Sequence, residues 1–276
     1  MYEAKVLADS IGPSGARLTT MQVTFPRIVL AEVNTHRALS RNSASSRAIP
    51  VERMLRRVED DPFIPIHWGK NQKGMQADEF LDATDQIAAE EEWLRARDAA
   101  VESVRELLAL GLHKQIANRL LEPWLWHTAI ISATDWSNFF ALRCHKDAQP
   151  EIQQAALMMR AARNASTPVR KYLGEWHLPL VGTERDDVTI WDCPIEVVCK
   201  ISVGRCARVS YLTHDGKRDP QADIDLCDRL QASGHMSPFE HVAQALSSPT
   251  RNGNFSGWLQ LRKMLPNEAV FGGGEP

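Results

Sequence analysis

The 276-residue sequence predicts an α+β fold, because two strand-like segments accompany a larger number of helix-like ones. Residues 18–25 alternate between side-chain types in a way typical of a strand, and 125–132 form a second apolar run of strand length. Apolar residues recur at helical spacing between 75 and 121 and again after 149. A chain of this length can bury a sizeable core, and we expect a single domain.

The expected domain has three parts. Residues 1–165 hold an arginine-rich loop and most of the helices, 166–198 form a connector, and 199–276 form a C-terminal part. Hydrophobic residues make up 43% and charged residues 24% of the chain, which is ordinary for a soluble globular protein. The net charge of -3 argues against a nucleic-acid binder built on a basic face.

The chain contains no apolar run near the roughly 18 residues that span a bilayer, and its first residues lack the features of a signal peptide. We therefore expect a cytoplasmic protein. The odd number of cysteines and the absence of a C-x-x-C pair favour reduced thiols over a disulfide framework. The histidines show no metal-ligand spacing, so we predict no metal site.

The elements follow in chain order. After the strand over 18–25, Pro26 suits the first turn of a helix over 27–39. A loop over 35–47 then lies at the C-terminal end of that helix, and 56–73 reads as an irregular surface segment. The Ala-, Leu- and Glu-rich stretch from 75 predicts a solvated helix that Gly111 ends.

A helix through Leu121 precedes the second strand, and a short helix follows it. Asp135 is a candidate N-cap for that short helix, which places Asn138 and Leu142 on one side with Arg143 beside them. A long helix begins after Gln149.

The connector predicts one or two strands and no catalytic residue. The C-terminal part predicts a helix that ends near Tyr211 and another that Asp219 caps and Gly234 ends.

The loop from Thr35 to Arg47 carries the densest polar chemistry, with arginines, a histidine, an asparagine and four serines. Guanidinium groups and serine hydroxyls are donors suited to a phosphate or a carbonyl. A helix C-terminus does not favour phosphate, so the arginines must carry the binding. A solvated Ser/Arg loop without a ligand remains the alternative.

The spacing H-R-x-x-S-x-N-x-x-S-x-R resembles a signature of the flavin-dependent thymidylate synthases, the ThyX family. The matching residues are His36, Arg37, Ser40, Asn42, Ser45 and Arg47. Two positions depart from the family pattern, since Thr35 stands where the family has its first arginine and Ser43 where it has glutamate.

Two further blocks resemble signatures of the same family. N-F-x-x-L-R-x-x-x-x-A-Q-x-E-I begins at Asn138, and C-A-R-V-S-Y is followed by a helix and G-H-x-S-P-F-E-H. The resemblance implies that Arg143 holds the uracil ring and favours ionisation at its N3, and that Arg119 contacts the nucleotide. From the residues alone, Arg143 could equally serve a structural ion pair. A lone His-x-Ser pair is more often structural than catalytic.

The third block comes first in the ordinary family, so the chain resembles a circularly permuted member. Such permutation is tolerated when termini lie close together on the surface. Residues 256–271 resemble a second, degenerate copy of the arginine helix, with Gln260, Arg262, Asn267 and Glu268 at positions like those of the signature. We hypothesise that the first copy binds phosphate while the second contributes to flavin or pyrimidine. Alternatively the second copy is a structural relic.

The resemblance covers most of the chain except 56–107 and the connector. It implies an antiparallel sheet packed with a helical bundle, and reductive methylation of dUMP to dTMP with FAD, NADPH and methylenetetrahydrofolate. No G-x-G-x-x-G follows a strand, so FAD is not expected in a Rossmann fold. Family members are homotetramers with shared sites, which implies a homo-oligomer.

The predicted site residues fall into overlapping groups. Arg143 is the catalytic candidate. The substrate-binding candidates are Ser45, Ser46, Arg47, Arg119, Arg143 and Gln260. The cofactor-binding candidates are His36, Arg37, Asn138, Ser210, His235, Ser237, Arg262 and Glu268. The departures at two positions leave alternatives open: alkylation or hydroxymethylation of another pyrimidine nucleotide, or a nucleotide- or flavin-binding relative without turnover.

Overall fold

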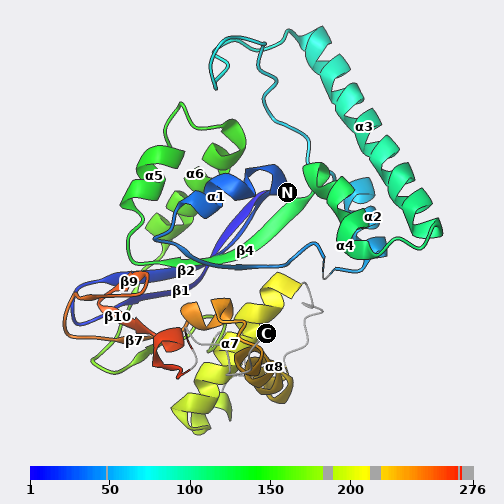
Figure 1. Ribbon diagram of the computed structural model, residues 1–276. Coiled ribbons are helices and arrows are strands. Elements are labelled where there is room, and N and C mark those ends of the chain that lie inside the picture. Colours follow the sequence, from blue (N-terminus) through cyan, green and yellow to red (C-terminus); the bar gives the residue numbers. More distant parts are fainter. Residues whose placement is uncertain (48, 183–188, 212–218, 267, 269–276) are drawn as a thin grey trace.

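A computed structural model describes residues 1–47, 49–182, 189–211, 219–266 and 268 (Figure 1). Its strands are β1 (Glu3–Ile11), β2 (Arg17–Pro26), β3 (Ser40–Ser43), β4 (Trp126–Ala133), β5 (Val169–Arg170), β6 (Trp176–His177), β7 (Ala243–Ala245), β8 (Arg251–Asn252), β9 (Phe255–Ser256) and β10 (Trp258–Gln260). Its α-helices are α1 (Leu30–Thr35), α2 (Val51–Asp60), α3 (Ala83–Ala109), α4 (Lys114–Ala117), α5 (Ser137–Arg143), α6 (Pro150–Ala165), α7 (Ile195–Tyr211) and α8 (Pro220–Ala232).

The central sheet has five strands in the order β3-β4-β2-β1-β5. All its neighbours pair antiparallel except β1 and β5, which pair in parallel. The expectation of a purely antiparallel sheet was therefore wrong at this edge. The chain leaves β4 and returns as β5 through α5 and α6, and such a helical crossover joins parallel strands of one sheet. The α+β class is confirmed.

Helices cover both faces of the sheet (Figure 1). On one face, α1, α5 and α6 pack on a core that includes Met21, Phe25 and Ile131, all fully buried. On the other face, α7 lies against β3 and β4, and Ile130 contacts Cys206 and Val209. The strands are thus buried on both sides, which accounts for the apolar character of β4.

Most of the predicted elements are confirmed. β2 and β4 cover the two expected strands, and α6, α7 and α8 lie where helices were expected. The Asp219 carboxylate accepts from the backbone N–H of Ala222 at 3.1 Å, as a cap at the start of α8 does. Gly111 and Gly234, with φ of 82° and 72°, take up the left-handed conformation that ends the preceding helices.

The arginine-rich segment was wrongly predicted as a loop throughout. The helix after Pro26 consists of a 3₁₀ turn (Arg27–Val29) and α1, and it ends at Thr35. Residues Ser40–Ser43 then form β3 and pair with β4. The free edge of β4 presents unpaired backbone groups, and this short polar segment satisfies them.

Three smaller boundaries also differ from the predictions. Residues 56–60 belong to α2, whose Met54, Leu55 and Val58 pack into a core cluster, so the irregular segment begins later. α3 starts at Ala83 and not near 75, because the Asp82 side chain caps it. The N-cap position of α5 is Trp136, although the Asp135 carboxylate accepts from the Ser137 N–H at 3.0 Å.

A buried chain of polar side chains ties the C-terminal part to the sheet. Thr20 Oγ1 and Ser132 Oγ lie 2.6 Å apart on neighbouring strands. His177 Nε2 lies 2.8 Å from Thr20 Oγ1, and His241 Nδ1 lies 2.8 Å from Ser132 Oγ. Burial lowers the pKa of both histidines to about 3, so both rings are neutral. His177, in the connector, therefore packs as an internal residue.

α3 is mostly exposed, with Val101 and Val104 as its buried residues, and Figure 1 shows it projecting from the body. None of the helices in the described part of the chain is both long and apolar enough to cross a membrane.

Candidate functional site

Strand β3 separates the predicted site residues into two sets, because successive side chains of a strand point to opposite faces. Arg41 faces α1, and its Nη1 donates to the carbonyls of His36 at 2.6 Å and Val33 at 3.2 Å. Ser40 and Asn42 are buried on the other face, toward the C-terminal part. The residues of this signature therefore lie in two different environments, one on each face of β3.

Arg143 and His36 meet beside a cavity of about 220 Å³. The Arg143 Nε donates to His36 Nε2 at 2.8 Å, and its Nη2 donates to Thr35 Oγ1 at 3.4 Å. The lining residues are Thr35, His36, Arg37, Ala38, Leu39, Asp135, Asn138, Phe139, Leu142 and Arg143. Four predicted site residues from two distant segments are thus together. The volume is below the roughly 300–1,000 Å³ of whole-ligand pockets, so it suits one end of a ligand.

The His36 ring is held neutral at this cavity. Burial, followed by the charges of Arg143 and Arg41, lowers the pKa of His36, while a hydrogen bond with Asn138 opposes this. Its Nε2 accepts from Arg143, so the ring proton is on Nδ1. An edge-to-face contact with Phe139, at 4.9 Å between ring centroids, fixes the ring plane.

Arg143 forms no ion pair with any carboxylate in the described part of the chain. The structural ion pair, which the sequence left open for this residue, is therefore absent from that part. The neutral ring of His36 orients the Arg143 guanidinium, and the positive charge of the guanidinium remains available to a ligand.

A second cluster gathers around the Glu122 carboxylate. Its Oε1 accepts from Ser46 Oγ at 2.7 Å, Arg119 Nη1 at 2.7 Å and Arg27 Nη2 at 3.2 Å. The amide of Asn118 secures the loop by donating to the Ser46 carbonyl at 2.7 Å. Two predicted nucleotide-binding residues, Ser46 and Arg119, are thus held by one acceptor.

Glu122 and Arg27 were missed by the sequence analysis. A signal existed for Glu122, since it lies three residues after Arg119 within one helical turn, at the spacing of a side-chain pair. Arg27 lies about a hundred residues earlier in the chain, and only the pairing of β2 with β4 brings it near.

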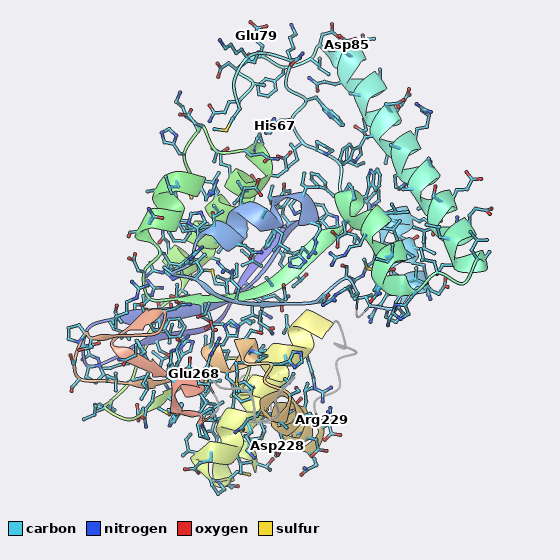
Figure 2. All side chains as sticks on the ribbon, in the orientation of Figure 1. His67, Glu79, Asp85, Asp228, Arg229 and Glu268 are labelled. Carbon is cyan, nitrogen blue, oxygen red and sulfur yellow. The ribbon has the colours of Figure 1, made fainter. Side chains whose placement is uncertain are left out.

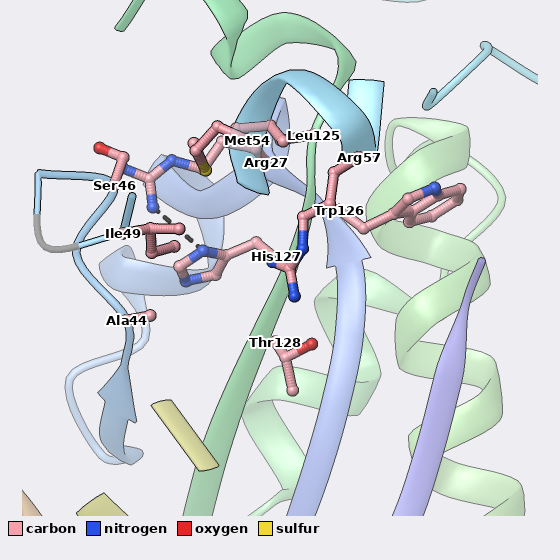
Figure 3. A pocket seen from close by; sticks show the side chains of 10 residues that line it. All are labelled: Arg27, Ala44, Ser46, Ile49, Met54, Arg57, Leu125, Trp126, His127 and Thr128. Atoms are coloured by element: carbon pink, nitrogen blue, oxygen red, sulfur yellow. Dashed lines mark hydrogen bonds between the residues drawn. The ribbon is translucent and has the colours of Figure 1, made fainter. Parts of the chain in front are cut away.

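Figure 3 shows the buried support behind this cluster. Arg27 Nη1 donates to His127 Nδ1 at 3.0 Å, and burial together with Arg27 lowers the pKa of His127 to about 3. The neutral ring therefore carries its proton on Nε2. The adjoining cavity, lined also by Ser46 and Arg57, is about 30 Å³, the scale of a water molecule. The hydrogen bond between Arg27 and His127 stiffens the cluster. The cavity itself is too small for a nucleotide ring.

The remaining first-copy residues lie on the turn after β3. Arg47 is exposed and Ser45 is half-buried. Arg47 forms no ion pair within the described ranges, so its guanidinium is open to an anion.

The C-terminal residues meet the other face of β3. Ser237 Oγ donates to Asn42 Oδ1 at 3.2 Å, and Asn42 Nδ2 donates to the Cys206 carbonyl at 3.0 Å. Gln260 is buried, and its Nε2 donates to Ser40 Oγ and to the Glu240 carbonyl, each at 3.0 Å. The Gln260 amide is thus engaged inside the protein, which favours a structural role over contact with substrate.

The other predicted cofactor residues are placed separately. Arg262 Nη1 pairs with Glu240 Oε1 at 2.5 Å, and Glu268 pairs with Lys263 at 2.5 Å. His235 Nδ1 lies 2.8 Å from Ser233 Oγ in an exposed turn. The side chain of Ser210 and the whole of Asn267 lie outside the described residues. Arg262, Glu268 and His235 do not line the cavity beside Arg143.

Across the described ranges, no group of three or more His, Cys, Asp or Glu residues is arranged to hold a metal ion. The donors at the site are guanidinium, amide, imidazole and hydroxyl groups, which suit carbonyl and phosphate oxygens.

A sequence model of the family described as thymidylate synthase complementing protein, Thy1, matches residues 17–169, more than half of the chain. The chain therefore belongs to the thymidylate synthase complementing protein family, the ThyX family.

Two solved structures of the UMP/dUMP methylase PolB from Streptomyces cacaoi are similar to the chain at 16% identity. The one bound with 5-Br UMP has a TM-score of 0.49, with 59% of this chain and 88% of that chain covered. The one bound with 5-Br dUMP has a TM-score of 0.45, with 59% and 90% covered. No curated protein sequence matches the chain. The family match contains the arginine loop and Arg143 but not the C-terminal blocks, so the circular permutation and the division into three parts stay predictions.

Proposed function

We propose that the protein is an FAD-dependent thymidylate synthase, which methylates dUMP to dTMP with methylenetetrahydrofolate as carbon donor and NADPH as reductant. The observation that carries the proposal is Arg143, a guanidinium held by a neutral histidine beside a cavity and unpaired with any described carboxylate. Membership of the ThyX family supports the same reaction.

In this proposal the two clusters bind the two ends of one nucleotide. The pyrimidine ring lies in the cavity beside Arg143, and the phosphate lies against Arg47, Arg119, Ser45 and Ser46. Binding energy from the phosphate then helps to orient the ring, as a remote group commonly does.

Arg143 makes the pyrimidine more reactive. Carbon 5 of uracil is a poor nucleophile, and donation to a ring carbonyl with stabilisation of an N3 anion raises its electron density. A permanently charged guanidinium does this without gaining or losing a proton. His36 keeps the guanidinium in position from its other side.

One edge of the flavin would be held by His36, Arg37 and Asn138, at the rim of the same cavity that they line. Their cationic and amide donors suit the carbonyl and phosphate oxygens of FAD. When bound, FAD supplies the hydride chemistry and the transfer of the one-carbon unit.

The cysteines support this route over one with a thiolate nucleophile. Burial raises the pKa of Cys199 and Cys227 to about 12 and raises that of Cys206 further, so these thiols stay protonated. Of the other two cysteines, Cys144 is half-buried and Cys193 is exposed, but neither lines the cavity beside Arg143. In this proposal Arg143 activates the pyrimidine instead.

The test is a spectrum of the purified protein, followed by NADPH oxidation with and without dUMP and methylenetetrahydrofolate. We expect a flavin absorbance and oxidation that requires both substrates for dTMP formation. UMP belongs in the same assay, because Thr35 and Ser43 depart from the signature. A colourless protein that consumes no NADPH would contradict the proposal.

We also propose that the protein is a homo-oligomer with shared sites, as the family resemblance implies. Multi-angle light scattering of the purified protein tests this directly, since a monomer that is fully active at low concentration would contradict shared sites.

A further inference from the structure

Arg41 is a charged residue of the arginine-rich segment that the proposed binding of dUMP and FAD does not use. It stands between Ser40 and Asn42, at a position that the signature H-R-x-x-S-x-N leaves open. It does not line the cavity beside Arg143. Its side chain is half-buried on the face of β3 toward α1. A guanidinium in such a place needs acceptors, and α1 supplies them.

The acceptors of Arg41 are backbone carbonyls at the C-terminal end of α1. One nitrogen, Nη1, makes both contacts, at 2.6 Å to the His36 carbonyl and 3.2 Å to the Val33 carbonyl. α1 has six residues, none of them basic in its last turn. The last carbonyls of a helix lack helical partners and carry partial negative charge, so a cation there is stabilising. Arg41 therefore caps α1 from a neighbouring strand.

The end of α1 also carries the two side-chain acceptors of Arg143. The Arg143 Nε donates to His36 Nε2 at 2.8 Å, and its Nη2 donates to Thr35 Oγ1 at 3.4 Å. His36 has already left the helical conformation, with ψ of 83°, so its position depends on how the end of α1 is held. A helix of six residues has little stability of its own. Fraying at this end would therefore separate His36 and Thr35 from Arg143.

β3 is a firm base for this cap, because its two faces contact different parts of the molecule. Ser40 and Asn42, on either side of Arg41, point to the opposite face. Ser40 Oγ accepts from Gln260 Nε2 at 3.0 Å, and Asn42 Nδ2 donates to a carbonyl of α7 at 3.0 Å. Figure 2 shows α1 on one side of the sheet and the C-terminal part, where Glu268 is labelled, on the other. The strand that carries Arg41 is thus fixed from the side opposite α1.

We propose that Arg41 is a positioning residue for the methylation, an inference that rests on the proposed function. By holding the carbonyls of Val33 and His36, it fixes the end of α1 so that the His36 ring meets the Arg143 guanidinium. Arg41 acts through His36 and does not itself contact the pyrimidine or the flavin. Its loss should therefore affect turnover more than the binding of dUMP.

The charge of Arg41 acts on the same ring. Burial lowers the pKa of His36 most, followed by the charges of Arg143 and Arg41, while a hydrogen bond with Asn138 opposes this. The charged side chains around the ring, among the described residues, are Glu32 and Arg37 at α1, Arg41 on β3 with Glu240 beyond it, and Asp135 and Arg143 at α5. Removal of the Arg41 charge should raise the pKa of His36, so the loss of activity in acid should begin at a higher pH.

The test compares two substitutions of Arg41 in the purified flavin-loaded protein. Arg41→Met removes the charge and the donors, so kcat for dUMP should fall about tenfold while KM changes less than about threefold. The acid limb of kcat/KM should move up by about half a pH unit. Arg41→Lys keeps the charge, and its ammonium can replace the one nitrogen that makes both contacts. It should keep the wild-type acid limb and a kcat within about threefold of the wild type.

Arg170→Met, at an exposed arginine on β5 of the same sheet, is the matched control and should behave as the wild type does. If Arg41→Met fails to fold, Arg41→Gln keeps a donor without the charge. It should show the same movement of the acid limb with kcat lowered less than about threefold. Wild-type kcat in folded Arg41→Met, an unmoved acid limb in the uncharged variants, or Arg41→Lys as impaired as Arg41→Met would overturn the inference.

The pKa of the His36 ring tests the inference without turnover. NMR of protein labelled with carbon-13 in its histidine rings measures this pKa, and His36→Gln identifies the resonance. If the wild type forms no dTMP but the pKa of His36 rises in Arg41→Met and not in Arg41→Lys, the positioning stands and the proposed function fails. If dTMP forms but Arg41→Met changes neither this pKa nor kcat, the proposed function stands and the positioning fails.

Discussion

The two arginines assigned to opposite ends of the nucleotide are held in opposite ways. Arg143 is oriented by the neutral ring of His36, with a hydrogen bond of 2.8 Å to its Nε2. Arg119 is paired with the Glu122 carboxylate at 2.7 Å, and Arg27 shares the same oxygen. Arg143 therefore has no carboxylate partner among the described residues, whereas Arg119 shares a carboxylate with Arg27 before any ligand arrives.

This difference corresponds to two different tasks. A group that stabilises charge developing on a ring during reaction is most effective when no carboxylate competes with it. A group that binds a phosphate already present in the substrate can exchange one anion for another, so a resident carboxylate is tolerated. We infer that Arg143 acts mainly on kcat and Arg119 mainly on KM.

The largest expected effect is at the uracil end. Arg143→Ala should lower kcat for dUMP about 100- to 1,000-fold, the effect of removing one donor to a developing charge, while the flavin spectrum is retained. Steady-state kinetics with a flavin absorbance measurement check this. Arg160→Ala, an exposed arginine on α6, is the control, and an equal loss there would show a non-specific effect.

A smaller effect is expected at the phosphate end. Arg119→Ala should raise KM for dUMP about 30-fold with kcat changed less than about threefold, because a charge-assisted contact to a substrate phosphate is lost. Titration with dUMP and with deoxyuridine measures the difference, since the nucleoside should bind both proteins alike. If Arg119→Ala lowered kcat and left KM unchanged, Arg119 and Arg143 would not differ in the way that we infer.

The pH dependence should follow His36. Its pKa is lowered from about 6.5, so the neutral ring is favoured above that value, and its contact with Arg143 is lost as the pH falls through the lowered pKa. We expect kcat/KM to be flat from about pH 6.5 to 8 and to fall up to about tenfold at lower pH.

His36→Gln should remove this acid limb, because the amide oxygen accepts from Arg143 without titrating. His113→Gln, at an exposed histidine before α4, should keep it. An acid limb that survives in His36→Gln would assign the titration to another group.

The smallest expected effect concerns Glu122. Glu122→Gln keeps an acceptor oxygen for Ser46 and Arg119 but removes the negative charge, so dUMP should bind about fivefold more tightly at low salt. Isothermal titration calorimetry at two salt concentrations checks this. Weaker binding would mean that the carboxylate positions the donors and does not compete with the phosphate.

Part of this arrangement could be predicted from the sequence. His36, Arg37, Asn138 and Arg143 were recognised by their spacing in two signatures, and the structure brings them to one cavity. The fold class could also be predicted, because β2, β4 and the long helices have a regular spacing of apolar residues that is visible in the sequence.

The rest depends on contacts between distant residues. β3 has no strand-like composition and exists because the edge of β4 is available to pair with it. Arg27, Glu122 and His127 meet only because β2 pairs with β4. Gln260 matched a ligand position in a signature, but its amide is engaged with Ser40 and Glu240, which the sequence alone could not reveal.

The most direct test of the proposed function is the structure of the nucleotide product. The purified protein would be incubated with dUMP, NADPH and methylenetetrahydrofolate labelled with carbon-13 in its methylene group, and the product analysed by mass spectrometry. We expect dTMP with the label in its 5-methyl group, and about 100- to 1,000-fold slower formation of labelled product by Arg143→Ala. A labelled hydroxymethyl nucleotide, or NADPH oxidation without any labelled nucleotide, would contradict the proposed function.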